Sequence, residues 1–303
     1  MLLRFAFVLA VLAGFSAAQK NPKKKVWADP AVAAQEDADF LVQGEYAKPG
    51  LGVQIIAHGN GKFQIVTYQG GLPGLGFDGK TVTRRDGNSL VVTKLLADGF
   101  QKIQRQSWTL GAKAPKGAKV LFDGTEASLS NWKKGARISK DGLLMQGVTS
   151  TSTFHDHFVH VEFRLPYQPH ARGQGRGNSG LYVQGRYETQ MLDSFGLKGM
   201  HNECGGIYSV RAPDLNACLP PLTWQTYDIE YKAARFGADG KKTTNAQMTV
   251  RLNGIVIHDK VELPKRTTAS PLPEGVEPGP VYLQNHGNPI RYRNIWVLPR
   301  SGN

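Results

Sequence analysis

The sequence has little acidic charge and carries no motif typical of nucleic-acid binding, although it is strongly basic. Its 303 residues include 24 Asp and Glu against 37 Lys and Arg, which gives a formal net charge of +13. A basic excess can indicate an acidic partner. Here the lysines gather at 20–25, 113–119 and 241–242, which are stretches typical of solvated tails and loops. We therefore expect no nucleic-acid partner.

Long hydrophobic runs are missing after the first twenty residues, so we expect no integral membrane segment in the mature chain. Residues 1–18 read MLLRFAFVLAVLAGFSAA, where Arg4 precedes an apolar run and small residues end it. This pattern predicts a signal peptide cut before Gln19 and export to the periplasm or the extracellular space. A membrane anchor is the alternative, but the run is too short to span comfortably and no basic stop follows it directly.

Cysteine is scarce, with Cys204 and Cys218 as the two examples. In an oxidising compartment such a close pair predicts a disulfide, which would pin the Pro-containing loop between them. Two buried thiols or a metal pair are the alternatives. Zinc normally takes more ligands at closer spacing, so we expect the disulfide.

No convincing long helix is present, whereas glycine and proline are abundant, with 35 and 17 residues. A chain that turns often and has few long apolar periods favours β structure. Hydrophobic residues make up 40% and charged residues 20%, which is a globular composition. We therefore predict an all-β protein.

Composition divides the chain into five parts. They are the signal peptide at 1–18, a basic N-terminal tail at 19–39, a small β accessory domain at 40–111, a linker at 112–119 and a β-sandwich at 120–300. The linker reads AKAPKGAK and lacks large apolar residues.

The accessory domain contains two strand candidates, 53–57 and 62–68, on either side of a turn at 58–61. Residues 89–94 and 102–109 are further strand candidates. Few polar groups converge in this unit, so we expect it to have no chemistry of its own.

The second unit shows clean alternation of apolar and polar residues. In 158–165, one face carries Val159, Val161, Phe163 and Leu165, and the other carries His160, Glu162 and Arg164. Residues 246–252 and 255–258 flank an Asn-Gly pair, which is a strong hairpin signal. The pattern predicts an antiparallel two-sheet sandwich.

The segment from Gly177 to Asp193 reads GNSGLYVQGRYETQMLD and is the most informative one. After Gly185, alternation places Tyr187, Thr189 and Met191 on one face and Arg186, Glu188 and Gln190 on the other. A solvated strand face is the alternative explanation for one such strand.

A second segment, 281–287, shows the same division. Val281 and Leu283 face inward, and Tyr282, Gln284 and His286 line the opposite face. Aromatic, amide, imidazole and carboxylate groups together suit a sugar, which offers hydroxyls and apolar C–H faces. We expect both polar rows to converge on one cleft, with Asn178 and Asp193 at its rim.

The second unit resembles the 3-keto-disaccharide hydrolases, a family once described as a domain of unknown function. The matching pieces, in order, are LFDG at 121–124, Trp132, NSG at 178–180, GRYE at 185–188, QMLD at 190–193, CGGIY at 204–208, WQTYD at 224–228, LQNHG at 283–287 and RYRNIW at 291–296. The resemblance implies a concanavalin A-like jelly roll of the lectin/glucanase type. It also implies secreted enzymes that act on glycosides oxidised at the sugar 3-position. The accessory domain lies outside the family pattern.

A 3-keto group acidifies the hydrogen on C2, so one base can start an elimination that expels the glycosidic oxygen from C1. Hydration then completes net hydrolysis. We assign Glu188 as the base, His286 as acid, base or metal ligand, and Arg186 as the group that polarises the ketone or keeps Glu188 ionised. A conventional glycosidase needs two carboxylates across the scissile bond, and Glu188 and Asp193 would point to opposite faces of a regular strand.

The remaining site candidates would bind substrate: Gln190, Gln284, Asn178, Asp193 and Tyr282. No cofactor is evident, although a divalent metal could stabilise the enolate. Glu188, His286, Asp193 and His201 are available ligands, but no spacing singles out a metal site. A non-catalytic carbohydrate-binding module is the main alternative function.

Overall fold

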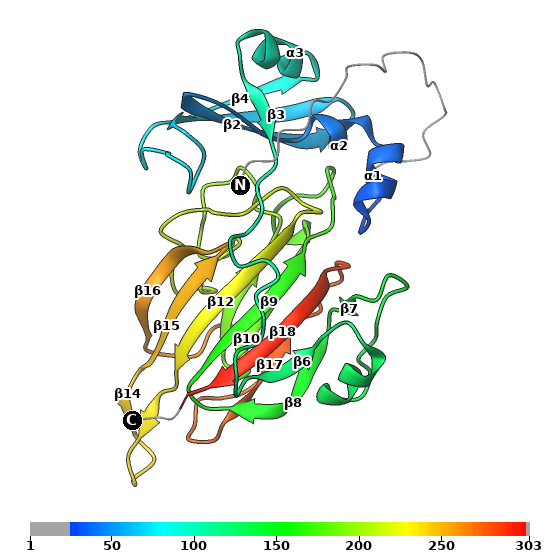
Figure 1. The fold of residues 1–303 in the computed structure, drawn as a ribbon. Coiled ribbons are helices and arrows are strands. Elements are labelled where there is room, and N and C mark those ends of the chain that lie inside the picture. The colour runs from blue at the N-terminus through cyan, green and yellow to red at the C-terminus, as the bar shows by residue number, and fades with distance from the viewer. Residues whose placement is uncertain (1–24, 301–303) are drawn as a thin grey trace.

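The computed structural model describes residues 25–300, which form two β units in series (Figure 1). The second unit is a sandwich of two antiparallel sheets, so the predicted all-β sandwich is confirmed. The predicted signal peptide lies outside the described residues. Within residues 25–300, no helix is long and apolar enough to cross a membrane.

The first unit is a five-stranded antiparallel sheet in the order β4-β3-β2-β1-β5. Its strands are β1 (Gly44–Lys48), β2 (Gly50–Gly59), β3 (Lys62–Gly70), β4 (Val82–Asn88) and β5 (Gln101–Ile103). The predicted hairpin around residues 58–61 is confirmed, because β2 pairs with β3 along its length.

Three short helices accompany this sheet: α1 (Pro30–Glu36), α2 (Ala38–Val42) and α3 (Leu90–Ala97). Part of the stretch expected to be a basic tail is therefore helical. The strand predicted at 89–94 is wrong, since Val91 and Leu95 share one buried side of α3 at the i, i+4 spacing. The strand expected over 102–109 shortens to β5, which ends at Ile103.

The sandwich pairs a four-stranded sheet, ordered β11-β10-β17-β8, with a seven-stranded sheet. The four strands are β8 (Val148–Phe154), β10 (Ser179–Val183), β11 (Tyr187–Met191) and β17 (Gly279–Leu283). The second sheet contains β6 (Lys119–Phe122), β7 (Leu144–Met145), β9 (His157–Arg164), β12 (Trp224–Lys232), β15 (Ala246–Leu252), β16 (Ile255–Leu263) and β18 (Arg291–Pro299). Smaller elements are β13 (Arg235–Phe236), β14 (Lys242–Thr244), and the 3-10 helices η2 (Glu126–Asn131) and η3 (Gly173–Gly175).

Alternation correctly predicts the sandwich core. The residues expected to face inward are buried in one apolar cluster: Val159, Val161, Phe163, Leu165, Tyr187, Met191, Val281 and Leu283. The predicted hairpin at residues 253–254 is also present, because β15 pairs with β16. Burial of these side chains is the main force that holds the two sheets together.

The outer face of β9 is also buried, because residues 104–112 cross it as a strap. Thr109 donates to Asp228 Oδ2 over 2.5 Å, and the Gly111 amide donates to Glu162 Oε1 over 2.6 Å. His160 lies between those two carboxylates. Burial alone would lower the pKa of His160, but its hydrogen bonds to Asp228 and Glu162 raise it above the ordinary value.

Residues 155–157, where β9 begins, differ in their exposure. His157 is fully buried against Phe154 and Tyr231, and Asp156 is buried and paired with Arg235. His155 alone of the three is exposed.

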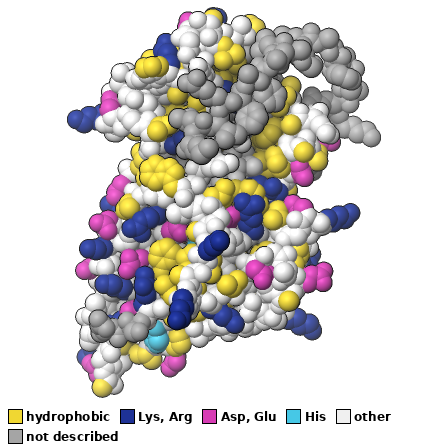
Figure 2. Space-filling model, viewed as in Figure 1, with side chains coloured by type: hydrophobic (Ala, Val, Ile, Leu, Met, Phe, Trp, Pro, Cys, Tyr) yellow, Lys and Arg dark blue, Asp and Glu magenta, His cyan; other side chains and the backbone are white. Residues whose placement is uncertain are grey.

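The first unit rests on one end of the sandwich, at the top of the view in Figure 1. Phe195 of the second unit packs in an apolar cluster with Ile56 and Val66 of the first. Tyr167 packs in the other core of the first unit, beside Trp27. The two units therefore share apolar cores. On the face shown in Figure 2, basic and acidic side chains are interspersed over the sandwich.

Candidate functional site

Polar side chains form two adjacent rows on the outer face of the four-stranded sheet. In the first row, Tyr182 of β10 lies opposite Glu188 of β11 and opposite Tyr282 of β17. In the second row, Gly180 lies between Gln190 and Gln284, and the Gln284 backbone N–H donates to the Gly180 carbonyl over 2.9 Å. Strand alternation, which buries the intervening residues in the core, produces this convergence.

Glu188 is the central group of these rows. Glu188 is 2% exposed, and its Oε2 accepts a hydrogen bond of 2.7 Å from the Tyr182 hydroxyl. Burial raises its pKa to about 7, although the bond from Tyr182 lowers it. Arg and Lys side chains form no salt bridge to it among residues 25–300. A carboxyl with this pKa exchanges a proton readily at neutral pH.

Gly180 makes room for that carboxyl. A Cβ atom at this position would lie 2.1 Å from Glu188 Oε1, well inside van der Waals contact. The glycine is therefore required by the close approach of a side chain and not by its own backbone angles.

Amide side chains surround one end of the carboxyl. Gln190 Nε2 donates to Gln174 Oε1 over 2.9 Å, and Asn178 Nδ2 donates to the Gln174 carbonyl over 2.8 Å. With its amide turned by half a rotation, Gln190 instead donates to Glu188 Oε1 over 3.1 Å and to the Ser179 carbonyl over 2.9 Å.

The other end of the network is formed by β17. Gln284 Nε2 donates to the Tyr182 hydroxyl over 3.2 Å, and the Tyr282 ring lies 5.2 Å from the Tyr182 ring between centroids. Gln284 and Tyr282 are half-buried, whereas Glu188 and Gln190 are almost fully buried. A ligand would therefore meet the β17 side of the network first.

Arg186 does not join this network. It donates to the Pro273 carbonyl over 2.6 Å, to Gln184 Oε1 over 2.9 Å and to the Glu277 carbonyl over 2.9 Å. Gln184 and Gly185 form a turn with φ of 52° and 62°, and β11 begins only at Tyr187. Strand alternation therefore does not extend back to Arg186, and the expected shared face with Glu188 is wrong for this residue.

His286 and Asp193 also lie apart from Glu188. His286 is exposed and follows the end of β17 at Leu283, so the predicted alternation stops before it. Asp193 is buried beyond the end of β11, where Arg176 Nε donates to its Oδ2 over 2.6 Å. Among residues 25–300, no three His, Cys, Asp or Glu side chains gather to hold a metal ion.

Sequence reasoning missed Tyr182, Gly180 and Gln174. Alternation within 179–183 places Tyr182 outward, and a hairpin centred on residues 184–186 sets it opposite Glu188. That combination was the available signal. Gln174 lies in an irregular segment whose sequence gives no comparable signal.

The predicted disulfide is not present. Cys204 and Cys218 are both free, buried thiols. Each sulfur has a polar neighbour, since Cys204 Sγ lies 3.4 Å from the Tyr227 hydroxyl and Cys218 Sγ donates to the Leu219 carbonyl over 3.5 Å. The pair therefore fills apolar space as thiols, as buried cysteines commonly do.

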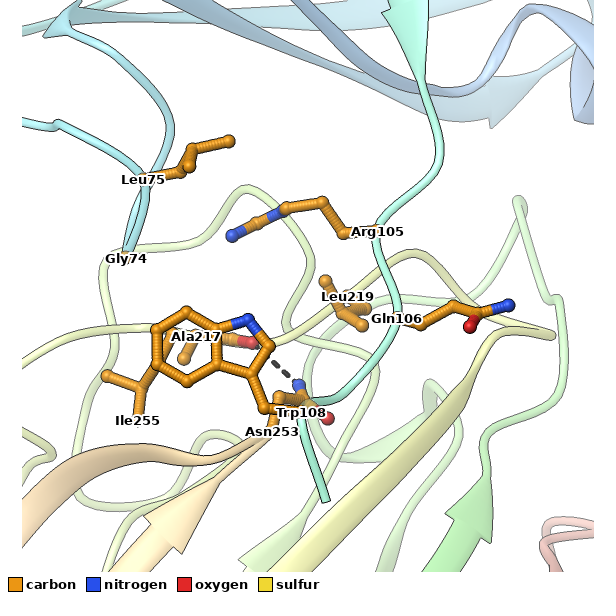
Figure 3. Close-up of a pocket in the computed structure, with 9 residues that line it drawn as sticks. All are labelled: Gly74, Leu75, Arg105, Gln106, Trp108, Ala217, Leu219, Asn253 and Ile255. Carbon is orange, nitrogen blue, oxygen red and sulfur yellow. Dashed lines mark hydrogen bonds between the residues drawn. The ribbon is translucent and has the colours of Figure 1, made fainter. Parts of the chain in front are cut away.

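A separate small pocket of about 40 Å³ lies where the two units meet (Figure 3). Trp108, Arg105 and Asn253 border it, with Ile255 beside the indole. The Asn253 side chain donates to the Ala217 carbonyl over 2.9 Å, and Arg105 is paired with Glu45. The polar groups of this pocket are thus bound to neighbouring protein groups where the two units meet. None of the residues that contact Glu188 lines the pocket.

The family described as the 3-keto-alpha-glucoside-1,2-lyase-like domain matches residues 117–298. The crystal structure of a "putative glycosyl hydrolase" from Parabacteroides distasonis ATCC 8503 at 2.13 Å resolution has 33% identity and a TM-score of 0.57, and covers 62% of this chain and 85% of that chain. Another from the same organism, at 1.70 Å resolution, has 18% identity and a TM-score of 0.46, and covers 61% and 95% respectively.

No curated protein matches the chain. The family match and the first crystal structure support an enzyme that acts on glycosides. The first unit lies outside the matched residues, so its role has to be inferred from the contacts that it makes.

Proposed function

The chain belongs to the 3-keto-alpha-glucoside-1,2-lyase-like domain family, and we propose that it cleaves glycosides whose sugar carries a 3-keto group. The observation that carries this proposal is Glu188, a buried carboxyl with a pKa of about 7 and a single tyrosine hydroxyl on one oxygen. Such a group suits the removal of a C–H proton next to a ketone, which needs a base poised near neutral pH.

In the proposed reaction, the Glu188 carboxylate takes the C2 proton, and the C2–H electron pair delocalises onto the 3-keto oxygen. As the ketone re-forms, the C1–C2 double bond forms while the C1–O bond breaks. The leaving oxygen keeps the electron pair of that bond and takes up one proton, which balances the proton that Glu188 removed. Addition of water across C1–C2 yields the free 3-keto sugar, so the sum is hydrolysis.

The network around Glu188 supports each requirement of that step. Tyr182 fixes one carboxyl oxygen, and Gln284 in turn donates to Tyr182. The amides of Gln190 and Asn178 supply neutral donors for sugar hydroxyls or for the enolate oxygen. The half-buried Tyr282 ring offers an apolar face to the sugar C–H groups.

A conventional two-carboxylate glycosidase is less well supported. Asp193 is the second carboxylate that the sequence offers, and Arg176 holds it beyond the end of β11. Its Oδ2 is engaged by that guanidinium at 2.6 Å, so the carboxylate is held in the loop and does not face Glu188 across a shared site.

The test measures turnover of a 3-keto-glucoside by the purified protein, and the release of the leaving group is the signal that is monitored. Glu188→Gln keeps the side-chain shape and removes the base, so we expect a loss of about 100-fold or more in kcat with ligand binding nearly intact.

Thr189→Val is the matched control, because the Thr189 hydroxyl points into the core without a hydrogen-bond partner. It should keep the wild-type rate. A wild-type rate in Glu188→Gln would place the base elsewhere. Saturable binding of the 3-keto-glucoside without turnover by the wild type would instead favour the carbohydrate-binding module.

We also propose that the protein is exported. The support is the pattern of residues 1–18, with one basic residue, an apolar run and small residues at its end. The mature protein recovered from the periplasm or the medium should then begin at Gln19. Retention of Met1 in all of the protein would contradict export by this route.

A further inference from the structure

Two irregular segments enclose the Gln190 end of the site. Residues 170–178 supply Gln174 and Asn178, and residues 192–203 supply the Asn202 carbonyl, which accepts from Gln174 Nε2 over 2.8 Å. Apart from the three-residue η3, neither segment is helical or part of a strand. Turn hydrogen bonds hold each segment locally, and the Asp193 backbone N–H donates to the Arg176 carbonyl over 3.0 Å. Side-chain contacts supply the remaining support.

Arg176 ties both segments to the first unit. It is 5% exposed, and its Nε donates to Asp193 Oδ2 over 2.6 Å. Its Nη1 also donates to the Ala57 carbonyl in β2 over 3.4 Å. One guanidinium therefore joins residues 170–178, residues 192–203 and the first unit.

The two units also meet through an apolar contact, formed by residues 195–196 of the second unit and Ile56 of the first. A Cβ atom at Gly196 would lie 2.3 Å from Ile56 Cδ1, so the chain at Gly196 passes directly against β2. Phe195 is 1% exposed in the cluster that contains Ile56, and Arg84 of β4 donates to the Gly196 carbonyl over 3.2 Å. The course of residues 192–196 thus follows the surface of the first unit.

We propose that the first unit is a positioning element of the active site, acting through Ile56 and Arg176. Its strand β2 sets residues 170–178 and 192–203, and these set Gln174 and Gln190 against Glu188. This inference rests on the proposed function for its kinetic consequences. It assigns a role to the first unit, which lies outside the family match.

The first experiment compares Ile56→Ala with Leu95→Ala in the full mature protein. Both changes remove apolar contacts from the first unit, but Leu95 belongs to α3, at the end of this unit away from the sandwich (Figure 1). We expect Ile56→Ala to lower kcat about 10-fold or more, and Ile56→Val to restore most of it. Leu95→Ala should retain the wild-type kcat at a temperature where each variant is folded.

Equal losses of kcat in Ile56→Ala and Leu95→Ala would overturn the proposal, and so would an unchanged kcat in Ile56→Ala. A second pair tests the guanidinium. Arg176→Lys should lower kcat, whereas Arg235→Lys, which alters the other buried-aspartate pair, should leave it unchanged. The reverse order would also overturn the proposal.

A measurement without substrate separates this inference from the proposed reaction. The Glu188 carboxyl carbon can be titrated by NMR in selectively labelled protein. If the first unit holds the site closed, Ile56→Ala and Arg176→Lys admit water and move the Glu188 pKa from about 7 towards its ordinary value of 4.5. Leu95→Ala and Arg235→Lys should leave it in place. If the Glu188 pKa does not move in Ile56→Ala and Arg176→Lys, the inference is wrong even if the enzyme turns over 3-keto sugars.

Discussion

Tyr182 and Glu188 face each other directly across neighbouring antiparallel strands, and the tyrosine hydroxyl donates to the carboxyl over 2.7 Å. The pairing occupies one oxygen and leaves the other above Gly180. Since burial outweighs this hydrogen bond, the carboxyl keeps a pKa of about 7. The first prediction follows from that balance.

The dependence of kcat/KM on pH should show an acid limb near pH 7, because the base works only when it is ionised. The rate should rise with pH through this limb. Tyr182→Phe removes the bond that lowers the Glu188 pKa, so its limb should move to higher pH. Tyr231→Phe loses a comparable buried hydrogen bond, to Gln184, and should keep the wild-type limb. If the acid limb of Tyr182→Phe stays at the wild-type pH, the Tyr182–Glu188 hydrogen bond does not set the pKa that controls catalysis.

The Glu188 carboxyl should lower the free energy of unfolding at high pH. Its folded-state pKa of about 7 lies above the ordinary 4.5, so the folded protein binds a proton that the unfolded chain releases between these values. The resulting cost is absent below about pH 4.5 and grows to about 3 kcal/mol above pH 7. Denaturant unfolding of Glu188→Gln should therefore show a gain over wild type at pH 8 and little difference at pH 4. Equal gains at both pH values would contradict the raised pKa.

Gly180→Ala should inactivate the enzyme while leaving most of the sheet intact. The added methyl group would lie 2.1 Å from Glu188 Oε1, so the carboxyl must leave its place beside Tyr182. We expect kcat to fall by about 100-fold, as for loss of the base itself. Gly275→Ala is a suitable control, since its nearest atom would be Arg186 at an ordinary 3.8 Å. Wild-type kcat in Gly180→Ala would show that the carboxyl can act from another position.

The two cysteines should behave as protected thiols. Both are buried, so the folded protein should not react with a thiol reagent that is restricted to water. Unfolding under non-reducing conditions should then expose two reactive thiols per chain. If unfolding exposes none, the pair is oxidised in the isolated protein, contrary to the structure.

Alternation predicts the core and the outward rows wherever a strand is regular. It places Met191, Leu283, Glu188 and Gln284 on their correct faces without knowledge of the fold. The same rule fails at Arg186, because the hairpin turn displaces it from the pattern of β11. Turn type and strand ends depend on packing that a short stretch of sequence does not contain.

Non-local contacts account for the other differences. His160 and Glu162 occupy an outward face by alternation, yet a segment about fifty residues earlier in the chain covers them. The partner of Glu188 lies across a strand pair, and Arg176, two residues after Gln174, donates to Ala57 of the first unit. These associations depend on which segments meet in three dimensions, and local sequence patterns do not specify that.

The strap at residues 104–112 has a consequence for how the protein can be divided. A truncated chain that starts at the family boundary, residue 117, would leave the Asp228 and Glu162 carboxylates without Thr109 and the Gly111 amide. It would also open the Ala112 contact of Trp296. Both carboxylates keep His160, and Glu162 keeps Arg293, but each loses a hydrogen bond and its cover from water, so such a fragment should be less stable than a chain that contains the strap. A chain that keeps the strap contacts must therefore begin no later than the end of β5, and Tyr167 and Phe195 would still need the first unit to cover them.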